Sequence, residues 1–187
     1  RGRIPVSLLD TVRAVEGVDA AEEAVGGYAQ LVDLEGKPLT TTGAPFLGVS
    51  WGHEARLRPA TLDVGRDPKG LAEIAIDRGT AKDYGFEVGD HTTVLLANGT
   101  QPEVEIVGIF TFGDANNLLG ARLTAFDVDV AAQVLGTEGE VDSIDVVAAE
   151  GVDPATLAQR IQAALPEGVE SVPGVQIADE AEDSIGG

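Results

Sequence analysis

Apolar residues recur at helical spacing near both ends of the chain, which predicts two amphipathic helices. The first helix ends at Gly17. Its apolar positions are Leu8, Leu9, Val12 and Val15. The second helix begins after Asp153, a favourable N-cap residue, with Pro154 in its first turn. Its apolar positions are Leu157, Ile161 and Leu165. Each helix therefore offers one face to a hydrophobic core.

Between these helices the pattern changes to short β segments separated by turns. Asn98-Gly99 is a strong hairpin signal, and Gly85 fits the left-handed residue that ends a short helix over 79–84. Asp127 fits the N-cap of a further helix. The predicted strands are residues 24–33, 45–51, 73–77, 92–97, 104–110, 121–126, 141–148 and 169–172.

The order of these elements predicts an α+β fold built from two parts. A split (discontinuous) βαβ-type unit takes residues 1–60 plus 121–174, because helices and strands alternate in both stretches. A small β-rich unit is inserted at residues 61–120, where several short strands and turns are typical of a small barrel or sandwich. The chain is therefore expected to leave the first unit, form the second and return.

The net charge of the chain limits the classes of partner that it can bind. It carries 32 acidic and 12 basic side chains among 187 residues, a formal net charge of −20. So large a negative charge repels the phosphate backbone of nucleic acids and anionic lipids. We therefore expect no nucleic-acid partner and no docking to a membrane surface through a basic patch. The lack of cysteine excludes disulfides, thiolate metal sites and cysteine nucleophiles. Because the chain starts at Arg1 and has no methionine, we expect a fragment of a longer protein.

One short motif suggests a hydrolase. Residues 48–52 (Gly-Val-Ser-Trp-Gly) match the G-x-S-x-G pattern of a nucleophile elbow, which requires a helix directly after the serine. Pro59 and the lack of apolar periodicity argue against such a helix, and only His91 could complete the order serine, acid, histidine. We therefore predict that Ser50 belongs to a strand and that Trp51 packs in the core. A secreted hydrolase built on Ser50 is the minor alternative.

No spacing in the chain is typical of a metal site. His53 and His91 each lack a second ligand at the usual interval. The densest acidic clusters, residues 114–117 and 127–129, lack the glycine and distal glutamate of a calcium-binding loop. The acidic pair at residues 22–23 fits a solvent-facing position. We therefore predict no metal site, no cofactor and no catalytic residue.

A longer block in the middle of the chain resembles a known family. It reads Glu-Ile-Ala-Ile-Asp-Arg-Gly-Thr-Ala-Lys-Asp-Tyr-Gly-Phe-Glu-Val-Gly-Asp over residues 73–90, and the turn at 98–99 and the strand at 104–110 follow. This block is similar to the extracytoplasmic (periplasmic core) domain of MacB/FtsX-like ABC transporter permeases. The opening segment 6–18 and the helix at 151–165 also resemble that family, so the resemblance covers nearly the whole chain.

The resemblance implies a non-catalytic domain on the extracytoplasmic side of a bacterial cytoplasmic membrane. Transmembrane helices of the parent chain would flank it, with one ending just before Arg1 and a stalk toward the next beginning at residues 175–187. A separate cytoplasmic subunit would bind and hydrolyse ATP, and a second permease could form a dimer partner. The implied function is to couple ATP-driven membrane motion to substrate export or partner engagement.

A regulatory role is the alternative, in which the domain binds and activates an extracytoplasmic partner such as a cell-wall hydrolase without transport. The candidate contact residues are Asn116, Asn117, Leu118 and Leu119, because paired leucines beside polar residues in a loop often mark a contact surface. The competing interpretation, that both leucines pack beneath the barrel, stays open at this point.

Overall fold

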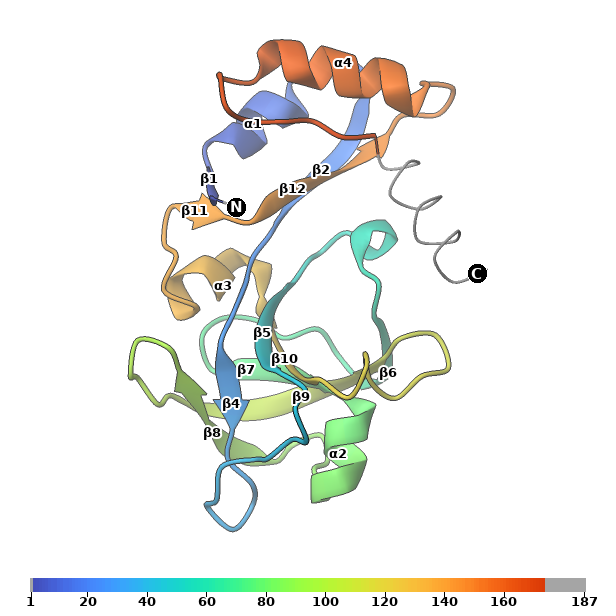
Figure 1. The fold of residues 1–187 in the computed structure, drawn as a ribbon. Coiled ribbons are helices and arrows are strands. Elements are labelled where there is room, and N and C mark those ends of the chain that lie inside the picture. Colours follow the sequence, from blue (N-terminus) through green and yellow to red (C-terminus); the bar gives the residue numbers. More distant parts are fainter. Residues whose placement is uncertain (1, 174–187) are drawn as a thin grey trace.

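Two groups of secondary structure, one above the other in Figure 1, make up the molecule. The computed structural model describes residues 2–173. One group, here called the two-layer unit, consists of a two-stranded sheet covered by helices α1 and α4. The other, here called the barrel unit, is built on an eight-stranded sheet that carries α2 and α3. The fold thus mixes α-helices and β-strands, with a mainly β framework and few helices.

The two-layer unit joins the beginning of the chain to its end. Strand β2 (Val18–Ala24) pairs antiparallel with β12 (Ser143–Ala148), and α1 (Leu8–Arg13) and α4 (Pro154–Ala164) pack on one face of the pair. A short ladder of β1 (Ile4–Pro5) and β11 (Glu140–Val141) lies beside them. The buried core of this unit is made of Leu9, Val12, Ala21, Leu157 and Ile161.

The barrel unit has the strand order β3-β5-β10-β7-β9-β8-β4, with β6 paired to β9. Its strands are β3 (Gly26–Gly27), β4 (Ala29–Leu31), β5 (Phe46–Trp51), β6 (Thr61–Gly65), β7 (Glu73–Asp77), β8 (His91–Leu96), β9 (Glu103–Thr111) and β10 (Arg122–Asp127). Its helices are η1 (Ala55–Leu57, a 3₁₀ turn), α2 (Arg78–Tyr84) and α3 (Val128–Val134). The first and last strands of the order, β3 and β4, are separated only by Tyr28, so the sheet curls round on itself.

A parallel strand pair positions the residues discussed below. Strands β5 and β10 run parallel in a register that sets Trp51 opposite Asp127. Because parallel strands end at the same edge of a sheet, the residues after Trp51 emerge beside the start of α3. Trp51 itself is buried against Phe110, as predicted.

Local sequence signals predicted several elements correctly. Gly85 ends α2 with φ 71°, and the side chain of Asp127 caps α3 through the amide of Asp129 at 3.0 Å. Strands β8 and β9 form the expected hairpin at the Asn98-Gly99 turn. Asp153 caps α4 with Pro154 in its first turn. These features depend on neighbouring residues, which explains why the sequence alone reveals them.

Other elements differ from expectation. Strand β2 begins at Val18, in a stretch where no strand was predicted, and residues 169–172 form no strand. Strands β5 and β10, expected in the split unit, are hydrogen-bonded within the eight-stranded sheet. Hydrogen bonding therefore does not break at residues 60 and 121, where the unit boundaries were expected. The predicted stalk at residues 175–187 lies outside the described residues.

No helix within residues 2–173 is both long enough and apolar enough to cross a membrane.

Candidate functional site

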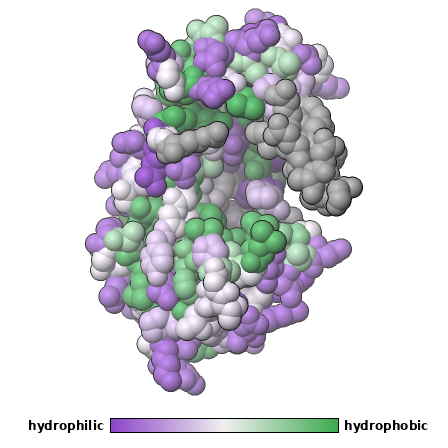
Figure 2. All heavy atoms as spheres, in the orientation of Figure 1, coloured by the Kyte–Doolittle hydropathy of each residue, from purple (hydrophilic) through white to green (hydrophobic). Residues whose placement is uncertain are grey.

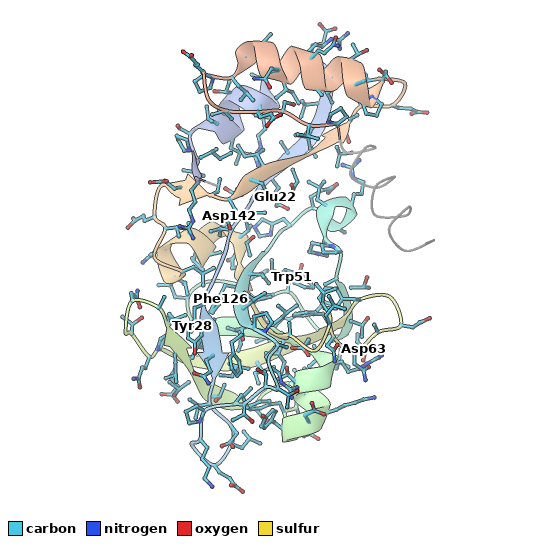
Figure 3. All side chains as sticks on the ribbon, in the orientation of Figure 1. Glu22, Tyr28, Trp51, Asp63, Phe126 and Asp142 are labelled. Carbon is cyan, nitrogen blue, oxygen red and sulfur yellow. The ribbon has the colours of Figure 1, made fainter. Side chains whose placement is uncertain are left out.

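The two units meet at a carboxylate that the sequence suggested would face solvent. Glu22 lies on β2 of the two-layer unit and is only 8% exposed. Its Oε2 accepts a hydrogen bond from the backbone amide of His53 at 2.8 Å, and its Oε1 accepts one from the amide of Glu54 at 3.2 Å. Figure 3 shows Glu22 between the two units, above Trp51 of the barrel sheet. The expected exposed position of Glu22 is therefore wrong, because the loop after β5 folds back onto it.

Further polar contacts connect the units at the same place. The guanidinium of Arg56, in η1, lies 2.8 Å from Asp19 of β2. A recess of about 440 Å³ opens here, lined by residues of both units that include Arg13, Asp19 and His53. In Figure 2 hydrophilic residues dominate the outer edges of both units on the visible face. At the junction itself, specific polar side chains connect the two units.

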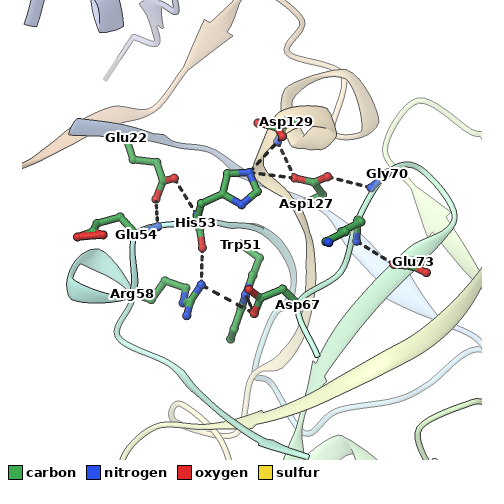
Figure 4. A network of polar contacts seen from close by, with 12 residues as sticks. Glu22, Trp51, His53, Glu54, Arg58, Asp67, Gly70, Glu73, Asp127 and Asp129 are labelled. Carbon is green, nitrogen blue, oxygen red and sulfur yellow. Dashed lines mark hydrogen bonds and ion pairs between the residues drawn. The ribbon is translucent and has the colours of Figure 1, made fainter. Parts of the chain in front are cut away.

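His53 lies against two carboxylates at this junction. Its Nε2 is 3.1 Å from Oδ2 of Asp129 and 3.7 Å from Oδ1 of Asp127 (Figure 4). The hydrogen bond to Asp129 is the main cause that raises the pKa of His53, and the charges of Asp127 and Glu22 act in the same direction. No short sequence pattern indicates this cluster, because His53 precedes Asp129 by 76 positions.

The end of β5 is held by an aromatic and charged group. The indole Nε1 of Trp51 donates to Asp67 at 2.8 Å, and the guanidinium of Arg58 stacks 4.5 Å from the Trp51 ring. Arg58 also donates to the carbonyl of Gly52, which fixes the path of the chain between Trp51 and His53. The loop that carries His53 is therefore anchored on both sides.

Ser50 does not occupy a nucleophile elbow. It lies within strand β5, and its hydroxyl accepts a hydrogen bond from the amide of Val25 at 3.0 Å. The segment after it forms the 3₁₀ turn η1 rather than the helix that an elbow requires. Its expected partner, His91, lies at the start of β8, where its ring faces Glu105 at 3.8 Å. Ser50 thus has a structural role in joining β5 to the segment after β2.

The candidate contact residues lie in the loop between β9 and β10. The carbonyl of Asn116 accepts from the amide of Gly79 at 2.9 Å, and its side-chain oxygen accepts from Arg78 at 2.6 Å. The side-chain oxygen of Asn117 accepts from the amide of Gly120 at 2.9 Å. The two asparagines therefore fix the loop to α2 and shape its turn.

The two leucines of this loop point into solvent. Leu119 is 94% exposed and has a φ of 55°, the only positive value at a non-glycine residue within the described part of the chain. Leu118 is also exposed. The interpretation in which both leucines pack beneath the barrel is therefore wrong. A branched apolar residue in this backbone conformation is strained, and such strain is often found at functional positions.

Sequence comparisons identify no relative. No family model matches the chain, and no curated protein matches it significantly.

Solved structures do resemble it. The periplasmic region of MacB from Actinobacillus actinomycetemcomitans matches with a TM-score of 0.66 and 13% identity, over 96% of this chain and 83% of that one. The extracellular domain of the ABC-type transporter YknZ, from Gram-positive bacteria, matches with a TM-score of 0.63 and 11% identity, over 91% and 89%. A domain of a Porphyromonas gingivalis protein described as a permease matches with a TM-score of 0.56 and 15% identity, over 88% and 70%.

These matches and the resemblance of the 73–110 block agree on the fold. The chain therefore has the fold of the extracytoplasmic domains of MacB/FtsX-like ABC transporter permeases.

Proposed function

We propose that this chain is a non-catalytic extracytoplasmic domain of an ABC transporter permease. It couples ATP-driven motion in the membrane to substrate export or to engagement of a partner outside the membrane. The observation that carries the proposal is the structural match to the periplasmic region of MacB over 96% of the chain. The engagement of the Ser50 hydroxyl by a backbone amide supports the non-enzymatic role.

The contacts between the units suit the transmission of motion. Strand β2 runs from the two-layer unit directly into β3 of the barrel unit. Glu22 and the Asp19–Arg56 ion pair join the same two units at a second place. Because a displacement of one unit strains all of these connections, we expect the units to move together.

A division of the chain into a split porter-type unit and an inserted β-rich unit is part of the proposal. The two-layer unit draws strands and helices from both ends of the chain, as a split unit requires. Because β5 and β10 pair within the barrel unit, the inserted part would begin near β3 rather than at residue 61 and would extend beyond residue 120.

The proposed partners follow from the transporter role. Transmembrane helices of the parent chain would hold the domain at the membrane, and a cytoplasmic ATP-binding subunit would act on it indirectly through them. A second permease copy is a further proposed partner.

Cysteine labelling tests the proposed location. This chain contains no cysteine, so Leu119→Cys in an otherwise cysteine-free parent protein creates a single, exposed reporter. A membrane-impermeant maleimide should modify it in spheroplasts with an intact cytoplasmic membrane. A matched Ala125→Cys variant, buried in β10, should stay unmodified until the protein is denatured. Modification of residue 119 only after lysis would refute the extracytoplasmic location.

A regulatory role is the second candidate, favoured by the exposed and strained Leu119. In that role the loop residues Asn116, Asn117, Leu118 and Leu119 contact an extracytoplasmic protein, such as a cell-wall hydrolase, through the two leucines. Capture of envelope proteins on immobilised domain, compared between the native chain and a Leu118→Asp, Leu119→Asp double variant, tests this contact. Equal capture of every specific partner by both proteins would exclude the loop as the contact surface.

A further inference from the structure

We propose that His53, Asp127 and Asp129 form a binding site for a divalent transition-metal ion, of which Zn²⁺ is the representative. The three side chains each present one ligand atom, and these atoms all lie within 4.8 Å of one another. They come from two segments that the parallel pairing of β5 and β10 brings to one edge of the barrel sheet. The site is independent of the transporter role proposed above.

The distances suit a shared ion. Zn²⁺ binds imidazole nitrogen and carboxylate oxygen at about 2.0–2.2 Å, so two ligands of a tetrahedral ion lie roughly 3.3–3.6 Å apart. The Nε2 of His53 is 3.1 Å from Oδ2 of Asp129 and 3.7 Å from Oδ1 of Asp127, values on either side of that range. Small side-chain rotations would therefore seat the ion.

The backbone holds the ligands in place. Asp127 accepts from the amide of Gly70 at 2.8 Å through Oδ2 and from the amide of Asp129 at 3.0 Å through Oδ1. The amide of His53 is bound by Glu22 (Figure 4). Hydrogen bonds to a ligating carboxylate orient metal ligands in this manner in known sites. The geometry is thus prepared before an ion arrives.

The surroundings favour a cation. Glu22, which stands opposite Asp145 in the β2–β12 pair, adds negative charge near His53. Among residues 2–173, no lysine or arginine forms an ion pair with Asp127 or Asp129. The side chains of His53 and Asp129 are 56% and 69% exposed, which leaves water free to complete the coordination. A mixed imidazole and carboxylate set suits Zn²⁺ better than Ca²⁺ or Mg²⁺, which prefer oxygen ligands alone.

Calorimetric titration of the chelator-treated chain with ZnCl₂ at neutral pH tests the site. We expect one equivalent of Zn²⁺ to bind, and the affinity to fall by about tenfold or more in His53→Ala and in Asp129→Asn. His91→Ala is the matched control, because within residues 2–173 that exposed histidine belongs to no cluster of three ligands, and it should bind Zn²⁺ like the native chain. CaCl₂ and MgCl₂ should bind more weakly than ZnCl₂.

The imidazole ¹⁵N signals supply a second measurement that does not depend on a variant. Addition of Zn²⁺ should shift the Nε2 resonance of His53 and leave that of His91 in place. Absence of saturable Zn²⁺ binding, equal affinity in the native chain and His53→Ala, or Ca²⁺ binding as tight as Zn²⁺ binding would each overturn the proposal. A shift confined to His91 would do the same.

Discussion

Gly52 of the barrel unit lies so close to Glu22 of the two-layer unit that a β-carbon at position 52 would overlap Oε1 of the glutamate. The same carboxylate binds the amides of His53 and Glu54, directly after Gly52. The missing side chain at position 52 thus makes room for the contact that joins the two units. Hydrogen bonds from an amide to a charged carboxylate are stronger than hydrogen bonds between neutral groups. We therefore expect this contact to stabilise the folded chain.

We predict that Gly52→Ala displaces the Glu22 carboxylate and breaks both amide hydrogen bonds. The expected loss is about 1–3 kcal/mol in the free energy of unfolding, measured by urea denaturation. Gly26→Ala is the matched control, since its β-carbon would approach the carbonyl of Gly48 at an ordinary 3.4 Å. If both variants are as stable as the native chain, the Glu22 contact contributes nothing to the junction.

The ion pair between Arg66 and Glu73 gives a pH-dependent prediction. The two terminal nitrogens of the Arg66 guanidinium, Nη1 and Nη2, each lie 2.6 Å from a carboxylate oxygen, and this bidentate contact lowers the pKa of Glu73. A carboxyl whose pKa is lower in the folded state stabilises the protein above its unfolded pKa. That contribution disappears as the pH falls through the folded pKa.

We therefore expect the native chain to be more stable than Glu73→Gln by about 0.5–1 kcal/mol at pH 7. The difference is small because water screens this partly exposed ion pair. The difference should shrink toward zero as the pH falls below the ordinary pKa of a glutamate and through the lower pKa of folded Glu73. Urea unfolding at several pH values measures it. A stability difference that stays constant or grows on acidification would contradict the assignment.

Because Leu119 has a strained backbone conformation, we predict that replacing it raises the stability of the domain and weakens partner binding. Its φ of 55° is costly for leucine and costs glycine nothing, so Leu119→Gly should raise the free energy of unfolding by up to about 1 kcal/mol. If the loop is a contact surface, the same variant should lose partner capture. Thermal unfolding and capture, measured on the same preparation, separate the two effects. A less stable glycine variant would contradict the strain assigned to Leu119.

We predict that replacing Ser50 changes the stability of the domain and no catalytic activity. Ser50→Ala leaves the amide of Val25 without its hydroxyl acceptor, which should cost about 1–2 kcal/mol of unfolding free energy. A fluorophosphonate probe should fail to label the folded native chain. Stoichiometric labelling that Ser50→Ala abolishes would instead establish the hydrolase alternative.

Sequence-local features of this fold were predictable. The caps at Asp127 and Asp153 and the left-handed Gly85 depend on residues within one helical turn. The Asn98-Gly99 hairpin likewise involves adjacent strands. In each case the interacting groups are close in sequence, so their spacing alone carries the information.

The junction was not predictable in the same way. Glu22 stands beside another acidic residue, Glu23, in β2, and its carboxylate is bound by a loop that follows 31–32 positions later. His53 meets Asp127 and Asp129 because β5 and β10 pair in parallel, a relationship that no short pattern encodes. The strand partners of β5 and β10 likewise depend on pairing between distant segments.

Fluorescence resonance energy transfer between a label on the domain and labels at the membrane surface tests most directly whether motion is transmitted. In lipid nanodiscs that contain the parent permease and its ATP-binding subunit, a donor at Leu119→Cys and acceptors on lipid headgroups report the height of the barrel unit. A second label at Gln159→Cys, on the exposed face of α4, reports the distance between the units. Trapping the ATP-bound state should change transfer to the lipid while the 119–159 distance stays constant. Unchanged transfer to the lipid during ATP turnover would contradict the account.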